Sequence, residues 1–229
     1  HIPNALTSCN LMSGCVAIVF ALSANYSMAL TFIVVGAVFD FFDGMSARLL
    51  GVSSPIGKEL DSLADVVTFG VAPSMMIYTI LLTIDKTGYN DILAAAAPYV
   101  AFVMAAFSAI RLAKFNLDER QTTSFIGLPT PANALFWGAL IVGSEEYLAL
   151  SSGSIYILLI MVFVSSWLLV AEIPMFALKF KHWGWRENKI KYVFLVSCLP
   201  LLLIFGITGI SVIIAWYICL SVITSKKNA

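Results

Sequence analysis

The chain has 229 residues, of which 60% are hydrophobic and only 11% are charged, and its mean hydropathy is +0.94. A soluble domain of this size does not need so much apolar surface, so the composition excludes an ordinary soluble globular protein. The formal net charge is zero and therefore says nothing about partners.

Long apolar runs predict an all-α membrane protein that forms a single domain over residues 1–229. A transmembrane helix needs about 20 apolar residues. Eight such spans are predicted, at roughly residues 5–22, 27–48, 60–83, 92–113, 130–144, 154–178, 192–206 and 209–224. The fifth and seventh are short enough that one of them could be re-entrant. Because the chain does not begin with Met, we expect an upstream segment to be missing.

Basic residues predict the orientation of these spans. Twelve of the thirteen lysines and arginines fall in the loops of one side, and only Lys86 falls on the other. The twelve are Arg48, Lys58, Arg111, Lys114, Arg120, Lys179, Lys181, Arg186, Lys189, Lys191, Lys226 and Lys227. The positive-inside rule makes this side the cytoplasm, so both termini are expected there, in a multi-pass protein of the cell membrane. The basic and aromatic segment from Lys179 to Lys191 suits the headgroup layer, either as an anchor or as a lipid-binding segment.

Several common sites are absent from the sequence. The four cysteines (Cys9, Cys15, Cys198 and Cys219) lie in apolar stretches without C-x-x-C spacing, so we interpret them as ordinary buried residues. No dinucleotide-binding, Walker or H-E-x-x-H motif is present, and two histidines argue against a histidine-based metal site. Short loops between membrane spans also argue against binding of nucleic acid.

A run of small and charged residues at fixed spacing is the most informative pattern. It reads Asp40-x2-Asp43-Gly44-x2-Ala47-Arg48-x8-Gly57-x3-Asp61-x3-Asp65. Residues three or four apart share a helix face, so two pairs of aspartates are expected, one ending the second span and one beginning the third. The short connection makes these spans antiparallel, and the two pairs should meet just below the cytoplasmic surface. Four carboxylates near hydrocarbon are costly without cations, which predicts a functional site.

The residue types in this run favour phosphate chemistry. Oxygen ligands without histidine or cysteine favour Mg²⁺, Mn²⁺ or Ca²⁺ over zinc. Two such ions held by four carboxylates would suit a phosphoryl displacement. Gly44 and Ala47 leave room for a nucleotide or for close helix packing, and Arg48 suits a phosphate. A purely structural role is disfavoured because no lysine or arginine lies inside these spans to balance the four charges.

The same run resembles the CDP-alcohol phosphotransferase signature, DxxDGxxARx8GxxxDxxxD, and matches all eight of its fixed positions. Members of this family are integral-membrane enzymes that transfer a substituted phosphate from a CDP-linked donor to an alcohol and release CMP. The resemblance implies that Asp40, Asp43, Asp61 and Asp65 hold two divalent ions, Mg²⁺ or Mn²⁺, with Ca²⁺ as an alternative occupant. It also implies that Asp65 is the general base, and that the protein forms a homodimer.

The resemblance further implies a site for the CDP-lipid. The family often opens with a Pro-Asn-x-Leu/Ile-Thr segment, which Pro3–Thr7 matches. The residues expected to contact the donor are Asn4, Thr7, Ser8, Gly44, Ala47, Arg48, Ser54 and Gly57. The donor is expected to be CDP-diacylglycerol, or an ether-linked CDP-archaeol if the source is archaeal.

Flanking segments narrow the resemblance to one branch of the family. The runs KELDSLADVVTFGVAPS (Lys58–Ser74), RLAKFN (Arg111–Asn116) and GLPTPANA (Gly127–Ala134) are similar to integral-membrane phosphatidylserine synthases. The implied reaction joins L-serine to the phosphatidyl group and releases CMP. The serine carboxylate needs a cation, so Arg111, Lys114 and Asn116 are candidate acceptor-binding residues. In the alternative interpretation, Arg111 and Lys114 anchor the helix or bind donor phosphate.

Three other functions are weighed against this one. A sibling enzyme would use glycerol 3-phosphate or inositol phosphate, whose phosphate needs a more basic pocket. An ion or proton transporter could use intramembrane carboxylates, but spans four to eight hold few ionisable residues at mid-depth. An inactive scaffold is disfavoured because the motif is intact.

Overall fold

The computed structural model describes residues 2–52, 54–85, 88–118, 125–150, 153–175 and 184–228, with only the backbone at 185–187 and 225–228. Each of the eight predicted spans falls on a helix within these ranges. The helices are α1 (Ile2–Leu22), α2 (Tyr26–Leu50), α3 (Pro55–Asp65), α4 (Ala72–Thr83), α5 (Asp91–Leu117), α6 (Thr130–Leu150), α7 (Ser154–Val170), α8 (Trp185–Phe205) and α9 (Thr208–Asn228), with the π-helical segment η1 (Val66–Val71) joining α3 to α4. Lys86, Arg120, Lys179 and Lys181 lie outside the described residues.

The helices make this a multi-pass membrane protein. Five are long and apolar enough to cross a bilayer: α1, α2, the continuous Pro55–Thr83 helix, α5 and the Asn188–Phe205 part of α8. Ser154–Val170 and Thr208–Thr224 are shorter apolar helices. The fifth and seventh predicted spans lie on helices of 21 residues each, longer than the apolar runs predicted from the sequence. The sixth was predicted too long, because α7 ends at Val170.

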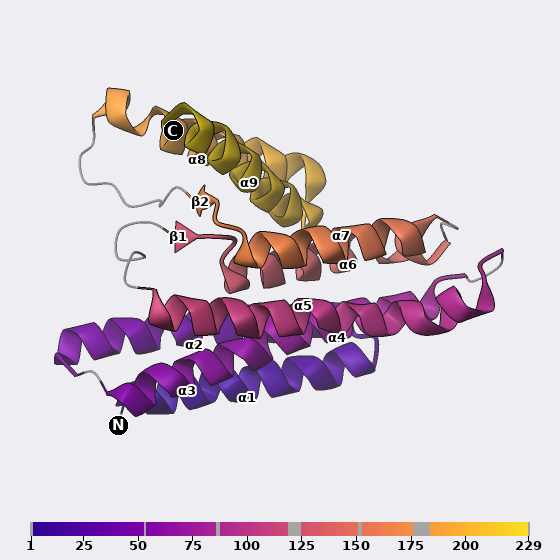
Figure 1. Ribbon diagram of the computed structural model, residues 1–229, viewed down its shortest axis with the longest axis horizontal. Helices are drawn as coiled ribbons and strands as arrows, with labels where there is room; N and C mark the ends of the chain where they lie inside the picture. The colour runs from indigo at the N-terminus through magenta and orange to yellow at the C-terminus, as the bar shows by residue number, and fades with distance from the viewer. Residues whose placement is uncertain are drawn as a thin grey trace.

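The helices are arranged in three layers (Figure 1). Helices α1 to α5 form the first layer, α6 and α7 form the second, and the α8–α9 hairpin lies outermost. Contacts of α6 with α2 and α4, of α7 with α5, and of α9 with α6 join the layers. Trp137 on α6 is fully buried, and its Nε1 donates a hydrogen bond to Ser165 Oγ on α7 at 3.1 Å.

A short ladder joins two loops at the end of the molecule where α5 and α7 finish. Strand β1 (Phe125–Ile126) pairs antiparallel with β2 (Pro174–Met175). The Gly127 amide also donates to the Ile173 carbonyl at 2.9 Å, and the Leu128 amide donates to Leu168. The chain after α7 is therefore held in an extended conformation next to the start of α6.

The turn between α2 and α3 brings the two halves of the aspartate run together. Gly51 ends α2 in the left-handed conformation, with φ of 62°, which glycine adopts without a steric penalty. Ser54 then caps α3 by accepting a hydrogen bond from the Gly57 amide at 3.0 Å, and Pro55 occupies the first helical turn. The last turns of α2 therefore lie beside the first turns of α3.

Close packing fixes the middle of the Pro55–Thr83 helix against α1 and α2. The helix widens into η1 just before Pro73, which has no N–H to donate to the preceding turn. Thr68 in η1 is fully buried, and its Oγ1 donates to the Asn10 carbonyl on α1 at 3.0 Å. Gly14 and Gly36 face Thr68 so closely that a side chain at either position would collide with it.

We expect Gly14→Ala to destabilise the fold by about 1–3 kcal/mol. The new Cβ would lie 2.8 Å from Thr68 Cα, and backbone cannot yield as a flexible side chain can. Thermal unfolding in detergent should show a lower midpoint. Gly153→Ala is the matched control, because a Cβ there meets nothing within 4 Å and φ is −91°. Equal midpoints for the two variants would show that α1 does not pack tightly on η1.

Candidate active site

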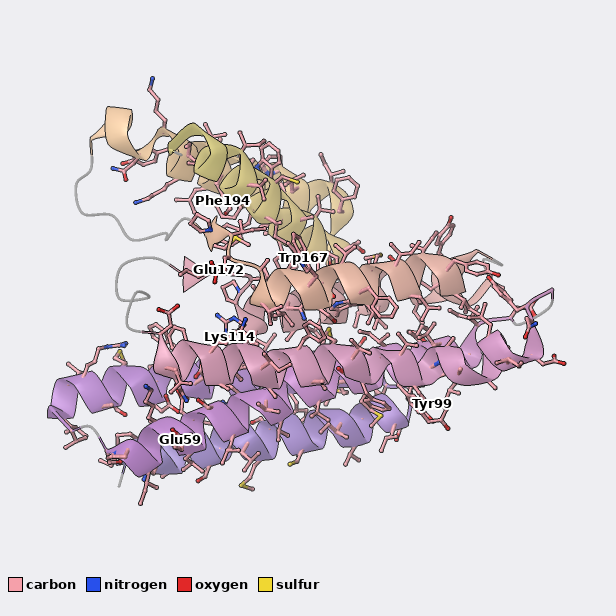
Figure 2. The ribbon with its side chains drawn as sticks, in the orientation of Figure 1. Glu59, Tyr99, Lys114, Trp167, Glu172 and Phe194 are labelled. Carbon is pink, nitrogen blue, oxygen red and sulfur yellow. The ribbon has the colours of Figure 1, made fainter. Side chains whose placement is uncertain are left out.

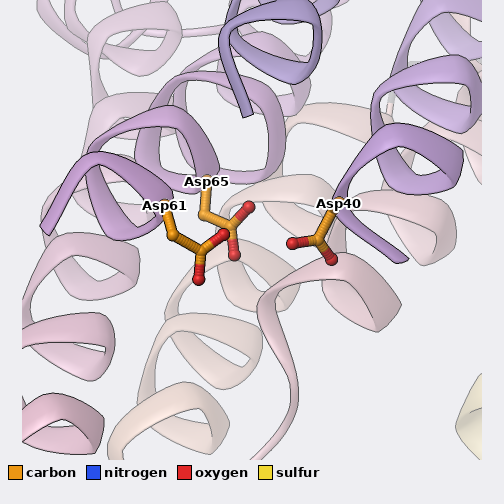
Figure 3. Close-up of side chains that lie close together, drawn as sticks. All are labelled: Asp40, Asp61 and Asp65. Carbon is orange, nitrogen blue, oxygen red and sulfur yellow. The ribbon is translucent and has the colours of Figure 1, made fainter. Parts of the chain in front are cut away.

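Three carboxyl groups converge where α2 ends and α3 begins. Asp40, Asp61 and Asp65 each offer an oxygen, and these three oxygens lie within 4.8 Å of one another. Figure 3 shows the carboxyl groups of Asp61 and Asp65 side by side, with that of Asp40 pointing toward them from α2. Asp65 is 8% exposed, and the other two are half-buried. The structure thus brings together three of the four aspartates that the sequence singled out.

The residues of this cluster fit a hard divalent cation. Like charges this close in a poorly solvated site repel one another unless a cation compensates. Asp61 Oδ1 is buried and has no hydrogen-bond partner, so its lone pairs are free to bind a metal ion. The donor set consists only of carboxylate oxygens, which Mg²⁺, Mn²⁺ and Ca²⁺ prefer. The cluster could therefore hold a metal ion.

Asp43 lies outside this cluster, on the side facing α1. It is 6% exposed, and its Oδ2 accepts a hydrogen bond from Thr7 Oγ1 at 2.7 Å. Asp43 and Asp61 both line a neighbouring cavity of about 530 Å³. Asp61 therefore belongs both to the three-carboxylate cluster and to the wall of this cavity.

The cavity beside Asp43, here called the α1–α3 cavity, contains most of the residues expected to contact a nucleotide. Its wall is formed by Pro3, Asn4, Thr7, Asp43, Gly44, Val52, Ser54, Gly57, Lys58 and Asp61. Ser8, Ala47 and Arg48 were expected there but do not line it. Ser8 Oγ donates to the Asn4 carbonyl at 2.8 Å, and the exposed Arg48 side chain lies against Gly44 on its own helix.

Lys58 in this wall is a residue that the sequence reasoning did not assign to the site. Its Nζ donates to the Asn116 carbonyl at 2.7 Å and so joins the start of α3 to the end of α5. Its position one residue after Gly57 in the motif was the available signal. A cation at this wall would favour an anionic ligand.

A second cavity, of about 390 Å³, lies between the ends of α5 and α7 and is here called the α5–α7 cavity. Its wall is formed by Arg111, Lys114, Leu117, Asp118, Ile126, Leu169, Val170, Ala171 and Glu172. Figure 2 shows Lys114 on α5 and Glu172 after α7 at the same end of the molecule. Asn116 does not line it, because its Nδ2 instead donates to Ser62 Oγ on α3 at 2.8 Å.

Arg111 is a buried cation in the wall of the α5–α7 cavity. It is only 7% exposed, and its Nη1 donates to Thr130 Oγ1 at 3.3 Å. Its Nε is buried without a partner, which leaves donor capacity for an anion. Arg111 also lies close enough to Asp65 for their charges to interact.

Asn10 on α1 is a second residue that the sequence reasoning missed. Its side chain is fully buried, and its Nδ2 donates to Asp65 Oδ1 at 3.0 Å. A lone asparagine in an apolar span carries no motif, so the only signal was the cost of a polar group in that position.

Comparisons with known proteins agree with this geometry. Residues 1–164 match the family model described as CDP-alcohol phosphatidyltransferase. The CDP-diacylglycerol--serine O-phosphatidyltransferase of Helicobacter pylori (strain ATCC 700392 / 26695) is 33% identical over 233 residues, which is 99% of this chain and 95% of the relative. The protein of the same name from Bacillus subtilis (strain 168) is 40% identical over 135 residues, 57% of this chain and 70% of the relative. That from Methanocaldococcus jannaschii is 34% identical over 161 residues, 70% of each chain. The chain therefore belongs to the CDP-alcohol phosphatidyltransferase family.

Proposed function

We propose that this protein transfers the phosphatidyl group of CDP-diacylglycerol to the hydroxyl of L-serine, giving phosphatidylserine and CMP. The names of the similar bacterial and archaeal enzymes support this reaction. The observation that carries it is the position of Asp65 in the carboxylate cluster. Asp61 of that cluster lines the α1–α3 cavity, and the positive charge of Arg111 in the wall of the α5–α7 cavity acts on Asp65. The α1–α3 cavity suits the donor headgroup, and the α5–α7 cavity, with Arg111 and Lys114 in its wall, suits the carboxylate of serine.

The proposal extends to the domain and to its place in the cell. The family model covers residues 1–164, and packing of α9 on α6 supports a single domain that continues to residue 229. We expect the site and both termini to face the cytoplasm at the cell membrane, because the loops on that side carry almost all of the basic residues. A homodimer stays a prediction. An ether-linked CDP-archaeol would present the same headgroup to the protein.

The metal ligands are proposed to be Asp40, Asp43, Asp61 and Asp65, which would hold two Mg²⁺ or Mn²⁺ ions. When bound, such ions neutralise negative charge on the phosphates and on departing CMP. Asp61 is suited to a shared role because it belongs to the carboxylate cluster and also lines the α1–α3 cavity beside Asp43.

The donor headgroup is proposed to occupy the α1–α3 cavity. Asn4 and Thr7 from α1 and Ser54 at the start of α3 offer hydrogen-bonding groups, while Gly44 leaves space on α2. Lys58 adds a positive charge for the diphosphate. The role expected for Arg48 requires its exposed side chain to turn from its position against Gly44 toward the cavity. Ser8 and Ala47 stay predicted donor contacts, since neither lines the cavity.

In the reaction, Asp65 takes the proton of the serine hydroxyl. The serine oxygen attacks the phosphorus that carries diacylglycerol, and the bond from this phosphorus to the oxygen of CMP breaks. Arg111 holds the serine carboxylate through its unpartnered Nε, beside Lys114 in the wall of the α5–α7 cavity. Serine is then held at two points, its carboxylate by Arg111 and its hydroxyl by Asp65, and this orients the hydroxyl for attack.

Arg111→Ala is expected to raise the KM for serine by about 10- to 100-fold, the effect of losing a charge-assisted hydrogen bond. The KM for CDP-diacylglycerol should change little. Arg111→Lys should recover only part of the affinity, because an ammonium lacks the planar fork of arginine. Lys189→Ala, on the exposed face of α8, is the control. A rise in the donor KM alone would assign Arg111 to the donor phosphate, and no change in either constant would make it an anchor.

The proposed function is tested by CMP release from purified protein with CDP-diacylglycerol, Mn²⁺ and one alcohol at a time. Serine should support release, whereas glycerol 3-phosphate and inositol phosphate should not. Release with one of these phosphates in place of serine would keep the family and overturn the acceptor.

A further inference from the structure

Asn10 is placed to hold the proposed general base from α1, the helix that packs beside α3. It lies on α1, is fully buried, and donates from Nδ2 to Asp65 Oδ1 at 3.0 Å. Among the described hydrogen bonds, this is the only one from a side chain outside the Asp40–Asp61–Asp65 cluster to a member of it. Neither the signature motif nor the two cavities include Asn10.

Packing fixes the orientation of the Asn10 amide. Its backbone carbonyl accepts the hydrogen bond from Thr68 Oγ1, in the π-helical segment that begins one residue after Asp65. Gly36 on α2 comes so close that a Cβ there would lie 2.9 Å from Asn10 Oδ1. Reversing the amide would turn this oxygen toward the Asp65 carboxylate, where two acceptors would repel. The amide is therefore held with its N–H₂ group toward Asp65.

The arrangement leaves one polar atom without a partner. Asn10 Oδ1 is buried and has no hydrogen bond, which is a cost that a purely structural position could avoid with an apolar side chain. The only polar side-chain contact of Asn10 among the described residues is the one to Asp65. The hydrogen bond to Asp65 therefore explains why an asparagine, rather than an apolar residue, occupies this position.

We propose that Asn10 is a positioning residue for the phosphatidyl transfer. Its amide holds Asp65 by Oδ1, whose second lone pair can still bind a metal ion, and so leaves Oδ2 as the oxygen that takes the proton from the acceptor hydroxyl. This inference rests on the proposed function and on Asp65 as its base. It adds that the buried hydrogen bond between Asn10 on α1 and Asp65 on α3 determines which carboxylate oxygen of Asp65 faces the acceptor hydroxyl.

The test compares Asn10→Leu, which keeps the size but not the amide, with Asn10→Gln, which keeps the amide on a longer stem. We expect Asn10→Leu to lower kcat for serine-dependent CMP release by about 100-fold, as misplacement of a catalytic group does. The KM values for both substrates should stay within about threefold of wild type. Asn10→Gln should recover part of kcat. Asn188→Leu makes the same change at another buried asparagine, on α8 and outside both cavities, and should leave kcat unchanged.

Two readouts without substrate separate positioning from structural damage. Mn²⁺ affinity, measured by calorimetry on metal-free protein, and the thermal unfolding midpoint should stay close to wild type in Asn10→Leu. A parallel loss of Mn²⁺ affinity, folding and kcat would make Asn10 a structural residue and overturn the inference. A kcat within twofold of wild type would also overturn it. If wild type releases no CMP with serine, the proposed function fails and this inference fails with it, whereas an active wild type isolates the result for Asn10.

Discussion

Asp65→Asn is expected to reduce serine-dependent CMP release at least about 1,000-fold, within the range lost when a general base is removed. The side chain keeps its size, so the helix bundle should fold as before. The amide can neither take a proton from the serine hydroxyl nor contribute a negative charge to the cluster with Asp40 and Asp61. Initial rates of CMP release at saturating serine and CDP-diacylglycerol measure the effect.

Glu145→Gln is the matched control for this variant. It makes the same carboxylate-to-amide change at an exposed position near the end of α6, away from the start of that helix where Thr130 meets Arg111. Its rate should equal that of wild type. If Asp65→Asn retained more than a tenth of the wild-type rate, another group would have to be the base.

Removal of divalent ions is expected to have the second large effect. Protein treated with a chelator and dialysed should release CMP at least about 100-fold more slowly, because compensation of phosphate charge by a metal is worth several kcal/mol. Mn²⁺ or Mg²⁺ should restore the rate. The measurement is the rate as a function of added ion, starting from metal-free protein.

Asp61→Asn makes this result specific to the carboxylate cluster. Asp61 is the residue shared by the cluster and the α1–α3 cavity, so its loss should raise the Mn²⁺ concentration for half-maximal rate by at least about tenfold. Full activity of chelator-treated wild type, or an unchanged Mn²⁺ requirement in Asp61→Asn, would contradict a metal site at these aspartates.

Hydropathy and spacing predicted the helices better than their ends. The eight apolar runs all fall on helices, since each is long enough to satisfy its backbone only in this way. The sixth was extended to residue 178 because the apolar sequence continues there. In the structure, residues Ile173–Met175 instead contact the chain around Phe125–Gly127. A contact between segments about 50 residues apart cannot be read from local periodicity.

The motif predicted the positions of the aspartates correctly wherever helix geometry alone determines them. The i, i+4 spacing of Asp61 and Asp65 and the short turn at Gly51 were enough to bring them to Asp40. The position of Asp43 was not predictable in the same way. Asp43 accepts a hydrogen bond from Thr7 because α1 packs closely on α2, where Gly36 lies against Asn10 of α1.

Side-chain direction at the ends of helices accounts for the other differences. Asn116 was grouped with Arg111 by sequence, but it lies five residues further on, on another face of α5, and donates to Ser62. Asn10 was missed because its role depends on a contact 55 residues away in the chain. The widening at η1, which presents Thr68 to α1, leaves no periodic pattern that distinguishes it from an ordinary helix.

The most direct test of the account follows labelled serine into lipid. Purified protein in detergent is given CDP-diacylglycerol, Mn²⁺ and ¹⁴C-serine, and the organic phase and released CMP are quantified together. The account predicts labelled phosphatidylserine and CMP in equal amounts, with neither formed by Asp65→Asn. CMP formed without label in the lipid, or no product from folded and metal-loaded protein, would contradict phosphatidyl transfer to serine.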